Sequence, residues 1–156
     1  MPRRYRPERR EVPPDFRYNS ELVARFTNRV MQRGKKSLAR SIVYDAFDII
    51  EEQTGKDALE VFEQAVNNAT PRLEVKPRRI GGATYQIPVE VSAHRGRALA
   101  MRWLVTLAER QPGRDFSEQL AAELMDAAND TGAAVARRDE AHRMAEANRA
   151  FARYRW

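Results

Sequence analysis

The sequence predicts a mainly α-helical single domain of about six helices, with a protruding β-hairpin arm and a basic, extended N-terminus. Apolar residues recur at helical spacing in six segments that glycine or proline separates. Two alternating runs flank Gly81-Gly82, which is the pattern of a hairpin. Arginine and proline dominate the start of the chain. These observations divide the chain into a basic arm (1–18), a helical domain (19–148) with the hairpin at about 72–91, and an aromatic and arginine-rich tail (149–156).

The N-terminal segment is too poor in apolar residues to form a core, and we expect it to be extended or disordered when free. Five of its first ten residues are arginines: Arg3, Arg4, Arg6, Arg9 and Arg10. This density favours an arm that orders on a nucleic acid. The alternative is a flexible solubilising tail.

The first helix is expected to begin after Asn19 or Ser20 and to continue to Gly34. Its apolar stripe is Leu22, Val23, Phe26 and Val30, and its other side carries Arg25, Arg29 and Arg33 at four-residue spacing. Like charges at that spacing weaken an isolated helix, so they favour neutralisation by an outside anion. Ordinary solvation is the alternative. Lys35 and Lys36 occupy the following turn.

The second and third helices are expected at about 37–53 and, after an Asp57–Glu60 capping box, to about 69. Their expected inward residues are Leu38, Ile42, Ala46, Ile49, Ile50, Leu59, Phe62, Ala65 and Val66. Residues 45–63 hold seven acidic residues and one lysine. We expect this face to point away from a polyanion, towards solvent or a basic neighbour.

The hairpin follows Pro71. Leu73 and Val75 alternate with charged residues, and a second apolar run resumes after the glycine pair at Tyr85 and Ile87. Pro77 and Pro88 remove ladder donors, so the pattern indicates an exposed two-stranded arm. Such an arm is marginal alone and must rest on helices. Lys76, Arg78 and Arg79 crowd the tip, Gly81 and Gly82 form the turn, and Arg95, Arg97 and Arg102 follow on the next helix. A basic ribbon beside a basic helix end fits nucleic-acid phosphates.

Three more helices are expected: one after Ser92 to about 109, one from a Phe116-Ser117 staple and cap to about 129, and one at about 133–148. Their expected inward residues are Leu99, Trp103, Leu104, Leu107, Leu120, Leu124, Met125, Ala128, Val135, Ala141, Met144 and Ala145. For Trp103, packing in the core is favoured over stacking on a base. The tail ending in Trp156 either contacts looped RNA through arginine and aromatic side chains or docks on the domain.

The bulk composition points to a polyanion partner. The 156 residues carry a net charge of +6, and residues 1–40 alone carry +8, so the remaining 116 sum to −2. One side of the protein is therefore basic. The chain has no cysteine, which excludes thiol catalysis and cysteine-based metal sites and fits a reducing compartment. No apolar run reaches a membrane-spanning length, and the start lacks the apolar core of a signal peptide.

Nothing in the sequence indicates an enzyme, a cofactor or a metal site. His94 and His142 are the only histidines, and we expect each to pack, cap or contact phosphate. No HExxH, Walker loop or GxGxxG is present, and the glycine pair lacks the strand and helix of a nucleotide cradle. The acidic residues fall on expected outer helix faces, where no apolar surroundings would shift their pKa values.

Four stretches resemble the family of the seventh small-subunit ribosomal protein, in its bacterial form. They are Asn19–Ala46, Arg78–Val91, Ala100–Leu104 and Met144–Trp156. The resemblance is collinear and covers nearly the whole chain.

The resemblance implies a helical domain with a protruding hairpin in the cytoplasmic small ribosomal subunit. Members bind the 3′ major domain of small-subunit rRNA directly and nucleate assembly of the head. They lie at the subunit interface, near the decoding centre and the exit-site tRNA, beside the ninth and eleventh small-subunit proteins. The resemblance implies no membrane and no homo-oligomer.

By analogy, the rRNA contacts fall on the arm, on Lys35 and Lys36, and on the hairpin side with the next helix, where Lys76, Arg78, Arg79, Arg95 and Arg102 lie. The hairpin tip and the last helix should lie nearer the tRNA. A different reading is a DNA-architectural protein that uses the hairpin as a groove-binding arm. A third, an RNA-modifying enzyme, would need a cofactor pocket.

Overall fold

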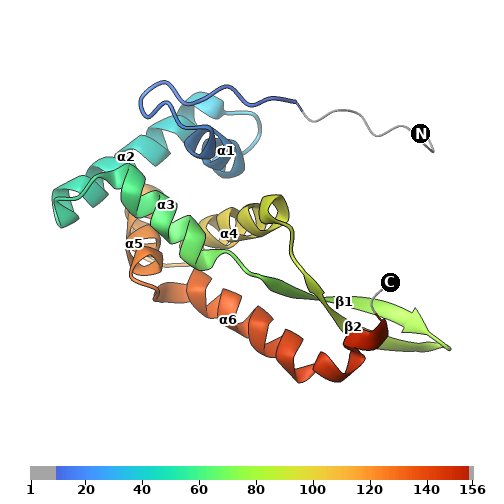
Figure 1. Cartoon of the computed structure of the whole chain (residues 1–156). Coiled ribbons are helices and arrows are strands. Elements are labelled where there is room, and N and C mark those ends of the chain that lie inside the picture. Colours follow the sequence, from blue (N-terminus) through green and yellow to red (C-terminus); the bar gives the residue numbers. More distant parts are fainter. Residues whose placement is uncertain (1–9, 155–156) are drawn as a thin grey trace.

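The computed structural model describes residues 10–154, which form a helical body with a long hairpin extending from it (Figure 1). The elements in chain order are α1 (Glu21–Val30), α2 (Lys36–Thr54), α3 (Ala58–Ala69), β1 (Leu73–Ile80), β2 (Ala83–Glu90), α4 (Ala93–Ala108), α5 (Phe116–Ala128), α6 (Gly132–Ala147) and the 3₁₀-helix η1 (Arg149–Tyr154). The mainly α fold with one protruding hairpin is therefore confirmed. No helix among the described residues is both long and apolar enough to span a membrane.

The core lies where α5 packs against α2, α3, α4 and α6. The apolar stripes of these helices and of α1 contribute large side chains that are fully buried: Phe26, Phe47, Phe62, Leu104, Leu120 and Leu124. Phe62 of α3 contacts both other phenylalanines, with ring centroids 4.9 Å from Phe26 and 5.3 Å from Phe47. Trp103 packs against this core at its edge, as its helical spacing predicts.

The helix ends follow the local sequence in some places and depart from it in others. The Asp57 side chain accepts from the Leu59 N–H at 2.9 Å, so the expected cap of α3 is confirmed. The first helix, however, ends at Val30 and not at Gly34, because Met31 is extended and Arg33 and Gly34 adopt positive φ angles of 52° and 76°. The expected cap at Ser117 is also wrong, since Asp115 is the N-cap residue and Phe116 begins α5.

Two residues expected in the core are on the surface. Leu38 is 54% exposed in the first turn of α2, and Met144 is 49% exposed in the last turn of α6. Helical periodicity gives the direction of a side chain but not the length of the neighbouring element. At these two ends, no neighbour covers the inward face completely.

The hairpin has a two-residue turn and a register that pairs Lys76 with Ile87 and Arg78 with Tyr85. Directly opposed residues share a face, so the charged side of β1 lies on the same face as the apolar side of β2. That face rests on α6 and η1. The side chain of Ile87 is completely buried there. The expectation that the hairpin rests on helices is confirmed.

The C-terminal segment packs on the hairpin. The ring of Tyr85 in β2 lies 5.3 Å from that of Phe151 and 6.2 Å from that of Tyr154, both in η1. These two aromatic side chains therefore dock on the protein, which was one of the two alternatives for the tail. Trp156 lies outside the described residues.

The segment before α1 is held against α2. The buried carboxylate of Asp15 accepts from the Tyr44 hydroxyl at 2.8 Å and from the Arg17 N–H at 3.0 Å. Arg17 forms a two-bond ion pair with Asp48, and Tyr18 packs edge-on against Phe47. Residues 15–18 are thus joined to the helical body, while Arg3, Arg4, Arg6 and Arg9 lie outside the described residues.

Candidate nucleic-acid interface

Several of the expected RNA-binding residues fall on three separate parts of the molecule. The first is a hollow between α1 and α4. Arg25 of α1 and His94 and Arg97 of α4 line this hollow of about 400 Å³. Arg25 donates to the Glu21 carboxylate one turn earlier, at 2.9 Å from Nε. Arg97 is exposed and forms no ion pair within residues 10–154. Cations on both sides of a hollow this size suit a phosphate group.

The base of the hairpin is the second part, and its charges are largely paired. Glu74, whose side chain is 13% exposed, accepts from Arg95 Nε and Nη2 at 2.8 Å each and lies 3.2 Å from Lys76 Nζ. The Arg95 hydrogen bonds hold the pKa of the Glu74 carboxyl below its usual range. The structure therefore places Arg95 and Lys76 around one carboxylate, where they carry a net +1 and join α4 to β1.

The hairpin tip is the third part. Gly81 and Gly82 adopt φ angles of 57° and 90°, which let the two strands turn in two residues. Arg79 is exposed, and its Nε donates to the Gly82 carbonyl at 3.4 Å. Arg78 is half-buried opposite Tyr85 and forms no ion pair within the part of the chain that the structure describes. The tip thus offers two cations and open backbone to a ligand.

Other predicted residues lie further apart. Lys36 begins α2 and Lys35 is its N-cap residue, so the expectation that both lie in the turn is wrong for Lys36. Both follow the end of α1, whereas the hollow lies at its beginning, and a ten-residue helix is about 15 Å long. Five exposed side chains have no ion-pair partner among residues 10–154: Arg10, Arg29, Lys35, Lys36 and Arg102. The predicted cations therefore form a discontinuous surface, with open positions on α1, its following turn, α4 and the hairpin tip.

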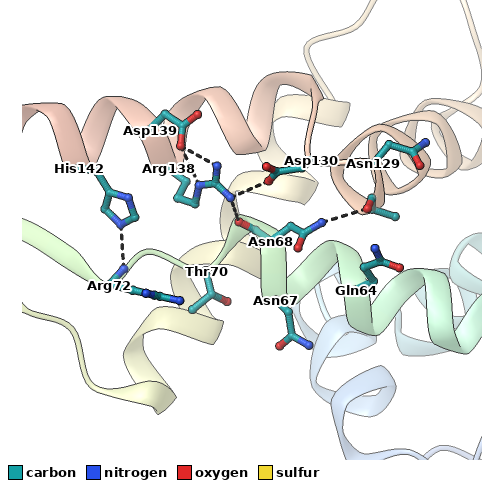
Figure 2. A pocket seen from close by; sticks show the side chains of 11 residues that line it. Gln64, Asn67, Asn68, Thr70, Arg72, Asn129, Asp130, Arg138, Asp139 and His142 are labelled. Atoms are coloured by element: carbon teal, nitrogen blue, oxygen red, sulfur yellow. Dashed lines mark hydrogen bonds and ion pairs between the residues drawn. The ribbon is translucent and has the colours of Figure 1, made fainter.

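A second polar cluster was missed by the sequence analysis. It joins the end of α3 to α6 and the start of β1 (Figure 2). Arg138 of α6 donates to the Asn68 carbonyl at 2.6 Å and pairs with Asp130 at 2.8 Å. His142, one turn later, accepts the Arg72 N–H at Nε2, 2.9 Å away. Burial, then the charge of Arg138, lowers the pKa of His142. The four-residue spacing of Arg138 and His142, which places both side chains on one face of a helix, was the sequence signal for this cluster.

Glu123 overturns the expectation that all acidic residues lie on outer helix faces. Its side chain is 1% exposed and accepts from the Ala134 N–H at 2.7 Å and from Gln111 Nε2 at 3.1 Å. Burial raises its pKa. The carboxylate thus caps the first turn of α6 from a neighbouring helix, which explains why the N-cap Thr131 makes no capping hydrogen bond itself.

Residues 10–154 contain no group of three or more histidine, aspartate or glutamate side chains able to hold a metal ion. The clusters found in this part of the chain are ion pairs and caps, and each has a structural explanation. The surface also carries exposed cations without an ion-pair partner among residues 10–154, and such open positive charge suits binding to a polyanion.

Comparison with known proteins gives one consistent match. The family model described as "Ribosomal protein S7p/S5e" matches residues 2–149. The chain is 62% identical to a protein of Thermomicrobium roseum, 59% to one of Arthrospira platensis and 60% to one of Synechococcus sp. (strain JA-3-3Ab), each over 156 residues and all of both chains. All three relatives are called "Small ribosomal subunit protein uS7".

Proposed function

The chain belongs to the ribosomal protein S7p/S5e family, and on that premise we propose that it is a structural protein of the small ribosomal subunit that binds its rRNA. A family of ribosomal proteins is not a family of enzymes, which agrees with the sequence-based prediction of a binding protein. The finer proposal is that it binds the 3′ major domain of small-subunit rRNA in the cytoplasm and starts assembly of the subunit head.

The observation that carries this proposal is the open positive charge on α1, its following turn, α4 and the hairpin tip. Arg29, Lys36 and Arg97 are exposed and have no ion-pair partner within residues 10–154. Phosphate contacts from such side chains would position the protein on RNA. Because an RNA helix has a deep, narrow major groove that side chains cannot read, specificity would come mainly from the shape of an RNA junction.

The attachment of the hairpin supports an organising role. Arg95 and Glu74 join the base of the hairpin to α4, and Tyr85 contacts η1 further along β2. A hairpin held at two places keeps a fixed direction relative to the helical body. RNA helices bound to the body and to the hairpin would therefore be fixed relative to each other, so later proteins would find their sites formed.

The remaining partners follow from the family resemblance. We propose that the exposed hairpin tip and the last helix, α6, lie towards the exit-site tRNA at the subunit interface, near the decoding centre. The ninth and eleventh small-subunit proteins are the proposed neighbours. The acidic surface of α2 and α3 would suit a basic neighbouring protein better than RNA.

A filter-binding titration tests the RNA-binding proposal. The ligands are a head-domain fragment of small-subunit rRNA, a length-matched control RNA and duplex DNA, each at several salt concentrations. We expect selective binding to the head-domain fragment, weakening by about 10³-fold or more between roughly 50 and 200 mM salt. Equal binding to both RNAs would contradict a specific site, and comparable binding to duplex DNA with bending would favour the DNA-architectural alternative.

A further inference from the structure

A polar hollow of about 780 Å³ lies away from the expected contact residues, where the ends of α3 and α5 meet α6 and the start of β1 (Figure 2). Its volume lies in the range of about 300–1,000 Å³ that small-molecule sites occupy. Its lining is mostly polar and comes from four different elements. The rRNA contacts proposed above do not involve this hollow.

The floor of this hollow is held in place by hydrogen bonds. Asn68 Nδ2 donates to the carbonyls of Ala127 and Ala128 at 2.9 and 3.0 Å, which joins α3 to the end of α5. Arg138 donates to the Asn68 carbonyl, and the Arg72 N–H donates to His142. Because these bonds join all four elements, the hollow keeps its shape without a ligand.

Several polar side chains around this floor have no hydrogen-bond or ion-pair partner within residues 10–154. The amides of Gln64, Asn67 and Asn129 make no hydrogen bond within residues 10–154, and the Arg72 guanidinium forms no ion pair there. Figure 2 draws all four side chains around the hollow. A side-chain amide carries both donors and an acceptor, as does the edge of a nucleic-acid base.

The charge of the hollow limits what it can bind. Arg138 pairs with both Asp130 and Asp139, at 2.8 and 2.7 Å, so these three side chains together carry a net −1, and Arg72 brings the sum to zero. Arg72 is then the one open cation among the described residues that line the hollow. One open cation suits one phosphate and does not suit a run of them, and three open amides suit one base edge.

We propose that this hollow binds a single nucleotide of RNA, with the base edge at Gln64, Asn67 and Asn129 and its phosphate at Arg72. The inference rests on the proposed function, because it takes RNA as the partner. It adds a site for one extruded nucleotide, on a different part of the surface from the basic positions of α1, α4 and the hairpin tip. Single-stranded and looped RNA presents unstacked bases that can enter such a site.

Nuclear magnetic resonance on the full chain tests this site directly. The probes are the four ribonucleoside 5′-monophosphates, ribose 5-phosphate and inorganic phosphate, each titrated to millimolar concentration. We expect at least one nucleotide to shift the side-chain amide signals of Gln64, Asn67 and Asn129 saturably. Ribose 5-phosphate and phosphate should leave those signals in place. No saturable shift with any nucleotide, or equal shifts with phosphate alone, would overturn the inference.

Variants separate this site from the general basic surface. Gln64→Ala with Asn67→Ala removes two amides from an exposed helix face without breaking a hydrogen bond, and should abolish the nucleotide shifts at Asn129. Gln53→Ala, an exposed amide at the end of α2, is the matched control and should leave them unchanged. Arg72→Ala should make a nucleoside and its monophosphate bind equally; a retained preference for the monophosphate would contradict the phosphate assignment.

The two proposals fail in different ways. If no nucleotide shifts the amides while the rRNA fragment still binds selectively, the hollow is not a nucleotide site and the proposed function stands. If the fragment binds no better than control RNA, the proposed function fails. Shifts confined to the amides of the hollow would then still report a nucleotide site.

Discussion

At the residue scale, single buried polar side chains join elements that are distant in the sequence. Glu123 connects α5 to the first turn of α6 and to Gln111 after α4, and His142 connects α6 to the start of β1. Glu123 accepts from the buried Ala134 N–H, which would otherwise lack a partner, and His142 accepts from the more exposed Arg72 N–H. Their loss should therefore be felt at both elements that they join.

Replacing Glu123 tests its capping role. Glu123→Ala leaves the Ala134 N–H and the Gln111 amide without an acceptor and creates a cavity, so we expect a loss of about 2–4 kcal/mol in the free energy of unfolding. Glu123→Gln keeps the shape and one acceptor oxygen and should lose clearly less. Urea denaturation of both variants measures the difference. Equal losses would mean that neither the retained volume nor one acceptor oxygen can replace the two acceptor oxygens of the carboxylate.

The lowered pKa of His142 predicts a pH dependence of stability. The folded protein resists protonation of His142, while the unfolded chain takes up that proton near the ordinary pKa of about 6.5. The unfolded state is therefore favoured as the pH falls below about 6.5, down to the lowered pKa of the folded state. His142→Gln keeps an acceptor for Arg72 and removes the titration.

We expect wild type and His142→Gln to have similar thermal stability at pH 8, and the wild type to lose more between pH 7 and 5. Both proteins share all their carboxylates, so the difference between the two curves isolates His142. Parallel curves over this range would show that His142 protonates equally in the folded and unfolded states.

At the element scale, the hairpin depends on support at its base and along β2. The base is joined to α4 by the Glu74–Arg95 pair, and the middle of β2 is covered by η1 through Tyr85. A two-stranded hairpin alone is marginal in water, so these contacts decide whether it holds one direction.

Truncating the η1 aromatics should loosen the hairpin without unfolding the body. An aromatic pair contributes about 0.5–1.5 kcal/mol beyond its buried area. For Phe151→Ala with Tyr154→Ala we therefore expect backbone amides of β2 to exchange several-fold faster, while those of α5 keep their rates. Ala152→Ser, an exposed change in η1, is the control. Unchanged exchange in β2 would mean that α6 and the Glu74–Arg95 pair support the hairpin without the η1 aromatics.

The hairpin tip should contribute to binding and not to folding. Arg78→Ala with Arg79→Ala removes two cations whose side chains make one hydrogen bond within residues 10–154, from Arg79 to the Gly82 carbonyl. We expect RNA affinity to fall by about tenfold, or about 1.4 kcal/mol. The free energy of unfolding should change by less than about 1 kcal/mol. A large drop in thermal stability would contradict the exposed-arm interpretation.

The sequence predicted the helices and strands better than it predicted where they end or which side chains join them. Alternation around Gly81-Gly82 is a local signal, and it placed the hairpin well. The exposure of Leu38 depends on where a neighbouring helix ends, which no local pattern records. Glu123 was missed because a buried carboxylate cap joins residues eleven positions apart in two helices, and its partner is a backbone N–H with no sequence signature. The predicted RNA-binding residues were chosen for charge, and the structure shows which of those charges are open.

At the scale of the whole molecule, the charge is polarised along the sequence. Residues 1–40 carry +8 and the rest of the chain −2. Asp15 and Arg17 join the beginning of this basic region to α2. Residues 15–18 therefore fix the point on the helical body from which the proposed RNA-binding arm would extend.

Removing the arm should change the salt dependence of binding. Deletion of residues 1–10 removes five arginines, and each lost phosphate contact lowers the slope of log K against log salt by about 0.7–0.9. We expect a slope smaller by as much as about 3.5 to 4.5 units, measured by filter binding. A variant with the same five arginines changed to glutamine keeps the length and should match the deletion. An unchanged slope in both would mean that the arm does not touch phosphate.

The contact between Tyr85 and the η1 aromatics also has a consequence for the order of events during synthesis. Phe151 and Tyr154 are translated more than sixty residues after Tyr85. At about 5–20 residues per second, several seconds separate the appearance of the hairpin from that of its support. A nascent chain therefore carries a loosely held basic hairpin, and only a completed chain presents it in its final direction. A chain truncated before Phe151 would lack both aromatic contacts to Tyr85, so its hairpin would stay loosely held.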